Sequence, residues 1–164
     1  MTLAAAVLAL VTIERLCELA LSRRNATRLA AAGAVEHGRE HYPAIVALHV
    51  AWLAGLWLLA RERPVDLAWL GVYLAFEVLR AWVMATLGRR WTTRIIVLPG
   101  APLVRSGPYR FLAHPNYVVV TAEVAVLPLV FGLPWYSLAF SVLNAAVLAV
   151  RIRTENAALA PLRR

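Results

Sequence analysis

The chain has 164 residues, of which 62% are hydrophobic and 16% are charged. A soluble domain is usually about 45–50% apolar and about 25% charged, and it needs polar side chains to cover its surface. The composition therefore excludes an ordinary soluble domain, and its aliphatic content excludes a disordered chain. The formal net charge is +8, and all 17 basic residues are arginines that sit in short clusters between long apolar runs. We expect a membrane protein rather than a nucleic-acid-binding protein.

Hydropathy defines four long apolar segments, residues 3–21, 43–60, 67–87 and 117–150. The first three match the roughly 20 residues that a helix needs to cross a bilayer core. The fourth would be about 50 Å long as a single helix, so we expect Pro128, Gly132 and Pro134 to divide it into a helical hairpin. Arg23 and Arg24 follow the first segment instead of preceding it, which favours a retained helix over a signal peptide. The sequence thus predicts an all-α integral membrane protein with five transmembrane helices.

The arginines outside these segments predict how the chain is oriented. Most of them lie between the first and second helices, between the third and fourth, or after the fifth. These are Arg23, Arg24, Arg28, Arg39, Arg89, Arg90, Arg94, Arg105, Arg110, Arg151, Arg153, Arg163 and Arg164. Only Arg61 and Arg63 lie between the second and third helices. Because basic residues are enriched in cytoplasmic loops, we expect an N-out, C-in topology, in a membrane such as the bacterial inner membrane.

The segment between the first two helices, residues 22–42, is polar with an Ala/Leu-rich centre. We expect a short helix in the membrane interface there, with a plain loop as the alternative because two glycines disfavour a helix. Glu36, His37 and His41 cluster near the end of this segment, and His49 lies inside the second helix. The HxxxH and HExxH spacings of common zinc sites are missing, so no metal site is expected.

The segment most informative about function is the predicted cytoplasmic loop, residues 88–116. It contains five arginines, four prolines and no acidic residue, and loops of this length are often functional. Its end reads Ser-Gly-Pro-Tyr-Arg at 106–110 and His-Pro-Asn-Tyr at 114–117. Proline is favoured at the first helical position, so we expect the fourth helix to begin at Pro115. His114 and Tyr117 would then lie on the same side of that helix.

Charged residues inside the predicted spans form a second candidate set, because ionised groups are costly in hydrocarbon and usually face a cavity or a partner. Glu77 and Arg80 are spaced to pair on one helix face, and Glu14 and Glu18 share a face of the first helix. Glu123 lies two turns into the fourth helix with no basic residue beside it in the sequence. We therefore interpret Glu77 and Arg80 as a structural pair and Glu123 as a functional group.

The cytoplasmic end of the fifth helix reads Arg-Ile-Arg-Thr-Glu-Asn at residues 151–156. Arg151 and Arg153 suit the C-terminal end of a membrane helix, where basic side chains complement the helix dipole. That role does not explain Glu155 and Asn156, which are predicted on the same side of the membrane as His114. We expect the start of the fourth helix and the end of the fifth to form one polar pocket.

Together these features resemble the isoprenylcysteine carboxyl methyltransferase family, whose members are integral membrane, S-adenosylmethionine-dependent methyltransferases. The resemblance rests on residues 106–117, the broken apolar hairpin and the terminal Arg-x-Arg-x-Glu-Asn, and it covers roughly residues 73–159. Residues 35–43 resemble a bacterial branch that O-methylates lipidic polyketides such as alkylresorcinols and alkylpyrones. The resemblance implies one transmembrane methyltransferase domain over residues 1–164, with its cofactor-binding core at about 88–160.

The resemblance also implies which residues hold S-adenosylmethionine at the cytoplasmic side. These are Tyr109, Arg110, His114, Pro115 and Tyr117 from the loop and the fourth helix, and Arg151, Arg153, Glu155 and Asn156 from the fifth. The cofactor carries a carboxylate and an ammonium, so its pocket needs both signs of charge. Arg110 or Arg153 can meet the carboxylate, and Glu155 can meet the ammonium.

The methyl acceptor is expected to be a lipophilic molecule that reaches the site through the membrane. A phenol or hydroxypyrone must lose a proton, so a nearby base assists its methylation; Glu123, the preferred base, His41 and His49 are the candidate catalytic residues. The alternative is carboxyl methylation of an isoprenylcysteine-like or other lipid acid, which needs only a cation such as Arg80 or Arg151. A small transporter or scaffold is a further alternative, although five helices make no inverted repeat.

Overall fold

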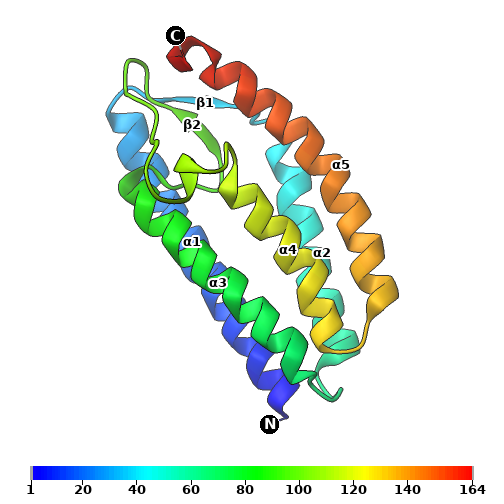
Figure 1. Cartoon of the computed structure of the whole chain (residues 1–164). Helices are drawn as coiled ribbons and strands as arrows, with labels where there is room; N and C mark the ends of the chain where they lie inside the picture. The colour runs from blue at the N-terminus through cyan, green and yellow to red at the C-terminus, as the bar shows by residue number, and fades with distance from the viewer. Residues whose placement is uncertain (1, 164) are drawn as a thin grey trace.

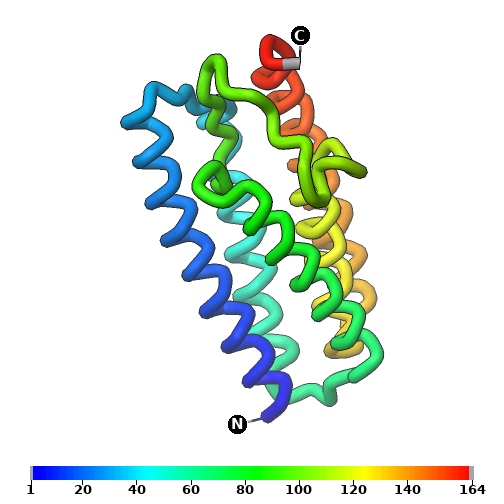
Figure 2. The backbone as a smooth tube through the Cα atoms, turned by 60° about the vertical axis from the view of Figure 1, so that its left-hand side comes forward, coloured from blue at the N-terminus to red at the C-terminus, as the bar shows by residue number. Residues whose placement is uncertain are grey.

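The computed structural model describes residues 2–163, within which five α-helices form an elongated bundle (Figures 1 and 2). The elements in chain order are α1 (Leu3–Ala31), β1 (Val35–His37), α2 (Tyr42–Ala60), α3 (Leu67–Leu87), β2 (Ile95–Val97), α4 (Pro115–Val130) and α5 (Pro134–Leu159). Short 3₁₀ turns lie at Gly88–Arg90, Gly107–Arg110 and Ala160–Arg163. Arg164, one of the arginines used to predict the orientation, lies outside the described residues. The predicted all-α fold is confirmed.

Three of the helical segments are long and apolar enough to cross a membrane: Tyr42–Ala60, Leu67–Arg90 and Pro134–Leu162. The apolar helix α4 is shorter. Large apolar side chains on these helices point outward, with Leu58 and Trp135 each 80% exposed and Val78 72% exposed, as expected of surfaces that contact lipid. Three of the five predicted spans are confirmed on length and composition, while crossing by α1 and α4 stays a prediction.

Helix α1 is a single helix of 29 residues, so the prediction of a separate interfacial helix after residue 21 is wrong. Its N-terminus is capped by the Thr2 side chain, which accepts a hydrogen bond from Ala5 N at 3.1 Å. Residues 22–31 contain alanine, leucine and arginine, which are strong helix formers, and no glycine or proline. The helix ends only before Gly33, whose φ of +84° suits glycine.

The two helices of the predicted hairpin, α4 and α5, pack against each other and are joined by the turn at residues 131–133. Helix α4 begins at Pro115 as predicted. Gly132, with a φ of +66°, and Pro134, in the first turn of α5, mark the reversal. Pro128 lies inside α4 near its end, so it contributes to the break less than expected.

A two-stranded antiparallel sheet connects the two loops at one end of the bundle (Figure 1). Val35 of β1 pairs with Val97 of β2. The ion pair of Arg94 with Glu36, at 2.9 Å between Nη1 and Oε1, adds to this connection. These strands were not predicted, because three residues each are too few to show an alternating pattern.

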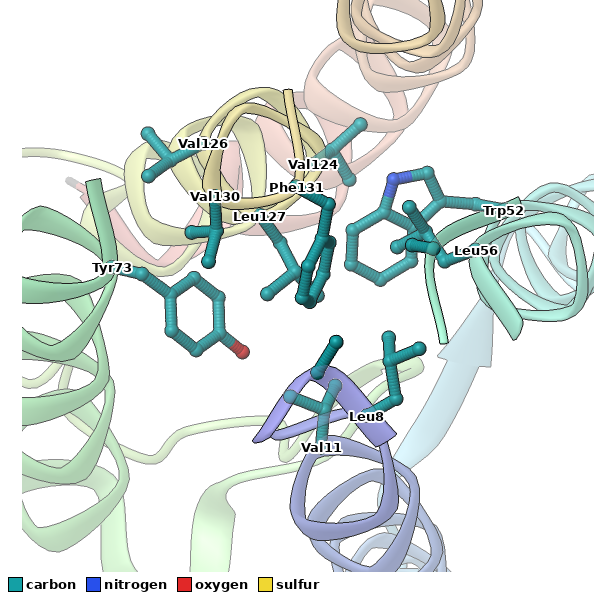
Figure 3. Packing of buried hydrophobic residues seen from close by; sticks show 12 residues of the cluster. Leu8, Val11, Trp52, Leu56, Tyr73, Val124, Val126, Leu127, Val130 and Phe131 are labelled. Atoms are coloured by element: carbon teal, nitrogen blue, oxygen red, sulfur yellow. The ribbon is translucent and has the colours of Figure 1, made fainter. Parts of the chain in front are cut away.

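The apolar core occupies the half of the bundle nearer the N-terminus. Leu8 of α1, Leu56 of α2 and Leu127 of α4 meet there with Phe131, all fully buried (Figure 3). Because lipid is as apolar as leucine, this packing stabilises the bundle through close van der Waals contact rather than through removal of water. The other half of the bundle contains cavities and polar side chains.

Candidate active site

A cavity with a volume of about 700 Å³ is called here the loop-side cavity. It lies at the end of the bundle that carries the strands and the C-terminus (Figure 1). Its walls come from residues 90–105, the start of α4 and the end of α5. This volume is typical of sites for small molecules and cofactors.

A smaller cavity, called here the bundle cavity, has a volume of about 240 Å³ and is lined by side chains of all five helices. The two cavities share four lining residues: Trp91, Asn116, Tyr117 and Arg151. These residues form a common wall. A molecule in each cavity would be brought together at this wall, which is the arrangement that a group transfer between two ligands needs.

A connected set of polar side chains lies between the start of α4 and the end of α5. The hydroxyl of Tyr117 donates a hydrogen bond to the Glu155 carboxylate, and the His114 ring stacks on Tyr117 with 5.3 Å between ring centroids. His114 Nε2 lies 3.1 Å from Asn156 Oδ1, and Nδ1 lies 3.7 Å from Glu155 Oε1. The start of α4 at Pro115 places His114 and Tyr117 on one side, as predicted.

Arg151 links this polar set to the loop. Its Nε donates to the Tyr117 hydroxyl at 2.9 Å, and its Nη2 donates to the backbone oxygen of Thr93 at 2.7 Å. It is buried and lines both cavities. Helix α5 continues past residue 150, so Arg151 and Glu155 follow each other by one turn and both face α4.

Not all of the remaining residues predicted to bind the cofactor line a cavity. Tyr109 lines the loop-side cavity, whereas Arg110, Pro115 and Arg153 line neither cavity. Burial and the negative charge of Glu155 raise the pKa of the Tyr109 phenol well above its usual range. The phenol therefore stays protonated at neutral pH and can donate a hydrogen bond into the cavity.

Glu123 lines the bundle cavity but is not the unpaired acid that its sequence neighbours indicated. Arg80 of α3 donates to both of its carboxylate oxygens, with 2.6 Å from Nε to Oε1, and Arg15 of α1 donates to Oε2 at 3.3 Å. Guanidinium donors thus occupy both oxygens, which leaves this carboxylate poorly suited to accept a substrate proton. The tertiary structure brings in cations from two other helices that the local sequence could not reveal.

The same arginines belong to a larger set of ion-paired side chains, of which Glu18, Arg80 and Glu123 are buried. This set, called here the arginine–glutamate cluster, consists of Glu14, Arg15, Glu18, Glu77, Arg80 and Glu123. Arg80 Nη1 contacts Glu18 Oε1 at 3.0 Å, and Arg80 Nε lies 3.9 Å from Glu77 Oε2. The predicted pairing of Glu77 with Arg80 is therefore present, within a network that joins α1, α3 and α4.

His49 lines the bundle cavity in a form suited to accept a proton. Its Nδ1 lies 2.8 Å from the backbone oxygen of Ile45. A carbonyl oxygen only accepts, so Nδ1 carries the ring proton and Nε2 of the neutral ring holds a lone pair. Within residues 2–163, no hydrogen-bond partner competes for that lone pair.

His41 lies elsewhere, because it forms the N-cap of α2 and packs against Gly38. It lines neither cavity. The structure thus brings His49 and Glu123 to one cavity and leaves His41 outside it, so the three predicted catalytic residues do not form one group.

Several lining residues were missed by the sequence analysis. Trp91 and Thr93 lie in the loop with no distinguishing pattern, and Thr93 Oγ1 is within 2.9 Å of both Ser22 Oγ and the Tyr42 hydroxyl. Asn144 is different, because it is a polar side chain in the middle of the apolar α5. Polar groups inside a span usually have a function, and that signal was present in the sequence.

Comparison with known proteins places this geometry in context. The family model described as isoprenylcysteine carboxyl methyltransferase (ICMT) family matches residues 69–161. YpbQ of Bacillus subtilis (strain 168), an uncharacterized protein, is 38% identical over 158 residues, which cover 93% of this chain and 94% of the relative. An uncharacterized protein of Haemophilus influenzae is 26% identical over 154 residues, 90% of each chain. No solved structure matches the chain. The matched family region contains nearly all of α3, together with α4, α5 and the polar set of the loop-side cavity, whereas α1 and α2 lie outside it.

Proposed function

Because the chain belongs to the isoprenylcysteine carboxyl methyltransferase family, we propose that it is a membrane methyltransferase that uses S-adenosylmethionine. The proposed acceptor is a hydroxyl group on a lipophilic phenol or pyrone. The observation that carries the proposal is the wall of Trp91, Asn116, Tyr117 and Arg151 shared by the two cavities. At these shared residues, a cofactor in the loop-side cavity would lie next to an acceptor in the bundle cavity.

The loop-side cavity has the chemistry that the cofactor requires. Arg90, Arg94 and Arg105 lie along its walls and can meet a carboxylate, while Glu155 can meet an ammonium. When bound, S-adenosylmethionine supplies an electrophilic methyl group. Tyr117 and His114 hold the Glu155 carboxylate in place, so the negative charge is oriented before a ligand enters. Preorganisation of this kind lowers the cost of binding.

The bundle cavity supplies the base that a hydroxyl acceptor needs. In the proposed reaction, His49 Nε2 would take the proton of the acceptor hydroxyl. The cofactor, when bound, would supply the methyl group that this oxygen receives and keep the electron pair of its broken carbon–sulfur bond. Trp91 and Tyr117 in the shared wall exclude water and align the two ligands, which is the main requirement of methyl transfer.

Carboxyl methylation is the second candidate, and a specific observation favours it. Arg151 lines the bundle cavity and forms no ion pair among the described residues, so its guanidinium can orient an ionised lipid carboxylate. Such an acceptor needs no base, so the requirement for His49 separates the two candidates.

The proposed enzyme has its active site at the cytoplasmic face of a bacterial inner membrane. The loops rich in arginine and the C-terminus lie at one end of the bundle, and the N-terminus lies at the other (Figures 1 and 2). The positive-inside rule then favours the N-out, C-in orientation. In this orientation the loop-side cavity opens towards the compartment that contains the soluble cofactor.

Titration of the detergent-purified protein with S-adenosylhomocysteine tests the cofactor site. We expect micromolar binding that weakens by about 10–100-fold in Glu155→Gln, because one charge-assisted hydrogen bond contributes about 1.5–3 kcal/mol. Glu62→Gln is the matched control, since Glu62 is exposed between α2 and α3. Equal affinity in the wild type and Glu155→Gln, or no binding to folded wild type, would remove the support for this site.

A further inference from the structure

Asn144, near the middle of α5, has a side chain whose role the fold does not explain. It is 1% exposed and lines the bundle cavity, yet its Nδ2 has no hydrogen-bond partner in residues 2–163. A buried amide without a partner costs about 1–3 kcal/mol, and such groups are rare enough to require an explanation. A ligand in the cavity provides one.

Other buried donors line the same cavity. The indole nitrogens of Trp52 and Trp91 and Nε of Arg15 have no partner among the described residues, and the two tryptophans are 4% and 2% exposed. Figure 3 shows the Trp52 nitrogen on the ring edge turned away from the α1 side chains. Among the described residues, the acceptors without a partner at this cavity are Asn116 Oδ1 and Nε2 of His49. The cavity therefore offers an excess of donors.

The arginines on the cavity walls differ in their partners. Arg15 and Arg80 are paired with the glutamates of the arginine–glutamate cluster, whereas Arg151 forms no ion pair among the described residues. The donors without partners suit a ligand group rich in oxygen lone pairs, and they disfavour an ammonium or amine, which brings donors of its own.

We propose that Asn144 is a specificity-determining residue that donates a hydrogen bond to a second oxygen of the acceptor, beside the oxygen that is methylated. The inference rests on the proposed function, which places the acceptor in the bundle cavity. His49 and Asn144 would then each form a hydrogen bond with a different oxygen of the same head group. The cavity selects head groups with two oxygens over those with one hydroxyl or with an amine.

Binding of three matched probes tests this role: an alkylresorcinol, an alkylphenol and an alkylaniline with the same saturated chain. Calorimetric titrations use the full-length protein in detergent with S-adenosylhomocysteine present. For the wild type we expect the resorcinol to bind about tenfold more tightly than the phenol, the value of one net hydrogen bond. The aniline should bind more weakly than the resorcinol.

In Asn144→Leu, the resorcinol and the phenol should bind with nearly equal affinity. The affinity for S-adenosylhomocysteine should not change. Its melting temperature should equal or exceed that of the wild type, because the substitution removes an unpaired buried amide. Asn144→Ala, which adds no volume, should give the same ratio. Ser141→Ala, one turn earlier in α5 and lining neither cavity, should retain the preference.

Equal binding of resorcinol and phenol by the wild type would overturn the inference, as would an unchanged preference in both Asn144 variants. Loss of stability in both variants would show a structural role and overturn it too. Failure of the resorcinol to bind to the folded wild type counts against it in the same way. Transfer of labelled methyl groups is measured separately: if the preference is present but no probe is methylated, the binding role stands and the proposed reaction fails.

Discussion

His49 lines the bundle cavity with a nitrogen, Nε2, that is free to accept a proton. Glu18, Glu123 and Arg80 are paired with one another, whereas the His49 ring uses only Nδ1, at Ile45. A neutral imidazole can take a proton without first losing an ion-pair partner. His49 is therefore better placed than Glu123 to act as a general base.

We expect His49→Gln to lower kcat for a phenolic lipid by about 10²–10⁴-fold, the usual contribution of a general base. The Kd for S-adenosylhomocysteine should not change, because His49 does not line the loop-side cavity. Transfer of a labelled methyl group in reconstituted vesicles measures kcat, and calorimetric titration measures the Kd. His37→Gln in β1, which lines neither cavity, is the control. A lipid acid methylated equally by the wild type and His49→Gln would favour carboxyl methylation instead.

The relative positions of two side chains could be predicted where the residues are close in the sequence and belong to the same helix. His114 and Tyr117 are three residues apart at a helix start marked by Pro115, so their common side follows from helix geometry. The environment of Glu123 could not be predicted, since its partners Arg15 and Arg80 are distant in the chain. A charge without local partners is not an unpaired charge.

The turn between α4 and α5 depends on the backbone of one residue. Gly132 has a φ of +66°, and a Cβ added there would meet no other atom within 4 Å. Gly71 in α3 is equally open to its surroundings but has ordinary helical geometry. A Cβ meets no neighbour at either position, so the difference between the two alanine substitutions reports on backbone conformation alone.

We expect Gly132→Ala to lower the free energy of unfolding by about 1–2 kcal/mol, the cost of a left-handed conformation for a residue with a Cβ. Gly71→Ala should raise it by about 0.5–1 kcal/mol through its effect on helix propensity. Unfolding of both variants in the same detergent measures the two changes. Equal effects of the same sign would contradict this account of the turn.

Element boundaries followed the sequence where proline, glycine or hydropathy marks them. The hairpin turn and the start of α4 are examples. The continuation of α1 to Ala31 was missed, because the hydropathy pattern marks the end of an apolar segment and not the end of a helix. The strands were missed because their pairing depends on two loops that are far apart in the chain.

At the scale of the whole molecule, the arginine–glutamate cluster connects three helices. Arg80 of α3 is 5% exposed and contacts Glu18 of α1 and Glu123 of α4. Removing one partner from a buried ion pair leaves the others uncompensated, which costs about 3–5 kcal/mol. The cluster thus sets the relative positions of the helices that surround the bundle cavity.

We expect Arg80→Met to destabilise the protein by about 3–5 kcal/mol, seen as a marked fall in melting temperature in detergent. Adding Glu123→Gln should recover part of this loss by removing one uncompensated charge. Arg61→Met is the control, because Arg61 forms only an exposed pair with Glu62, which contributes about 0–1 kcal/mol. Equal melting temperatures for Arg80→Met and Arg61→Met would show that the cluster does not hold the helices together.

The sequence alone determined the class of molecule, the apolar segments and the polar motifs at the ends of α4 and α5. These features depend on local hydropathy and on short spacings along one helix, which the order of residues contains directly. Only the tertiary structure decided that Glu123 is paired, that His41 lies apart from His49, and that Arg151 belongs to a wall between two cavities. Those properties depend on which helices lie side by side, because the partners of a buried polar group come from distant parts of the chain.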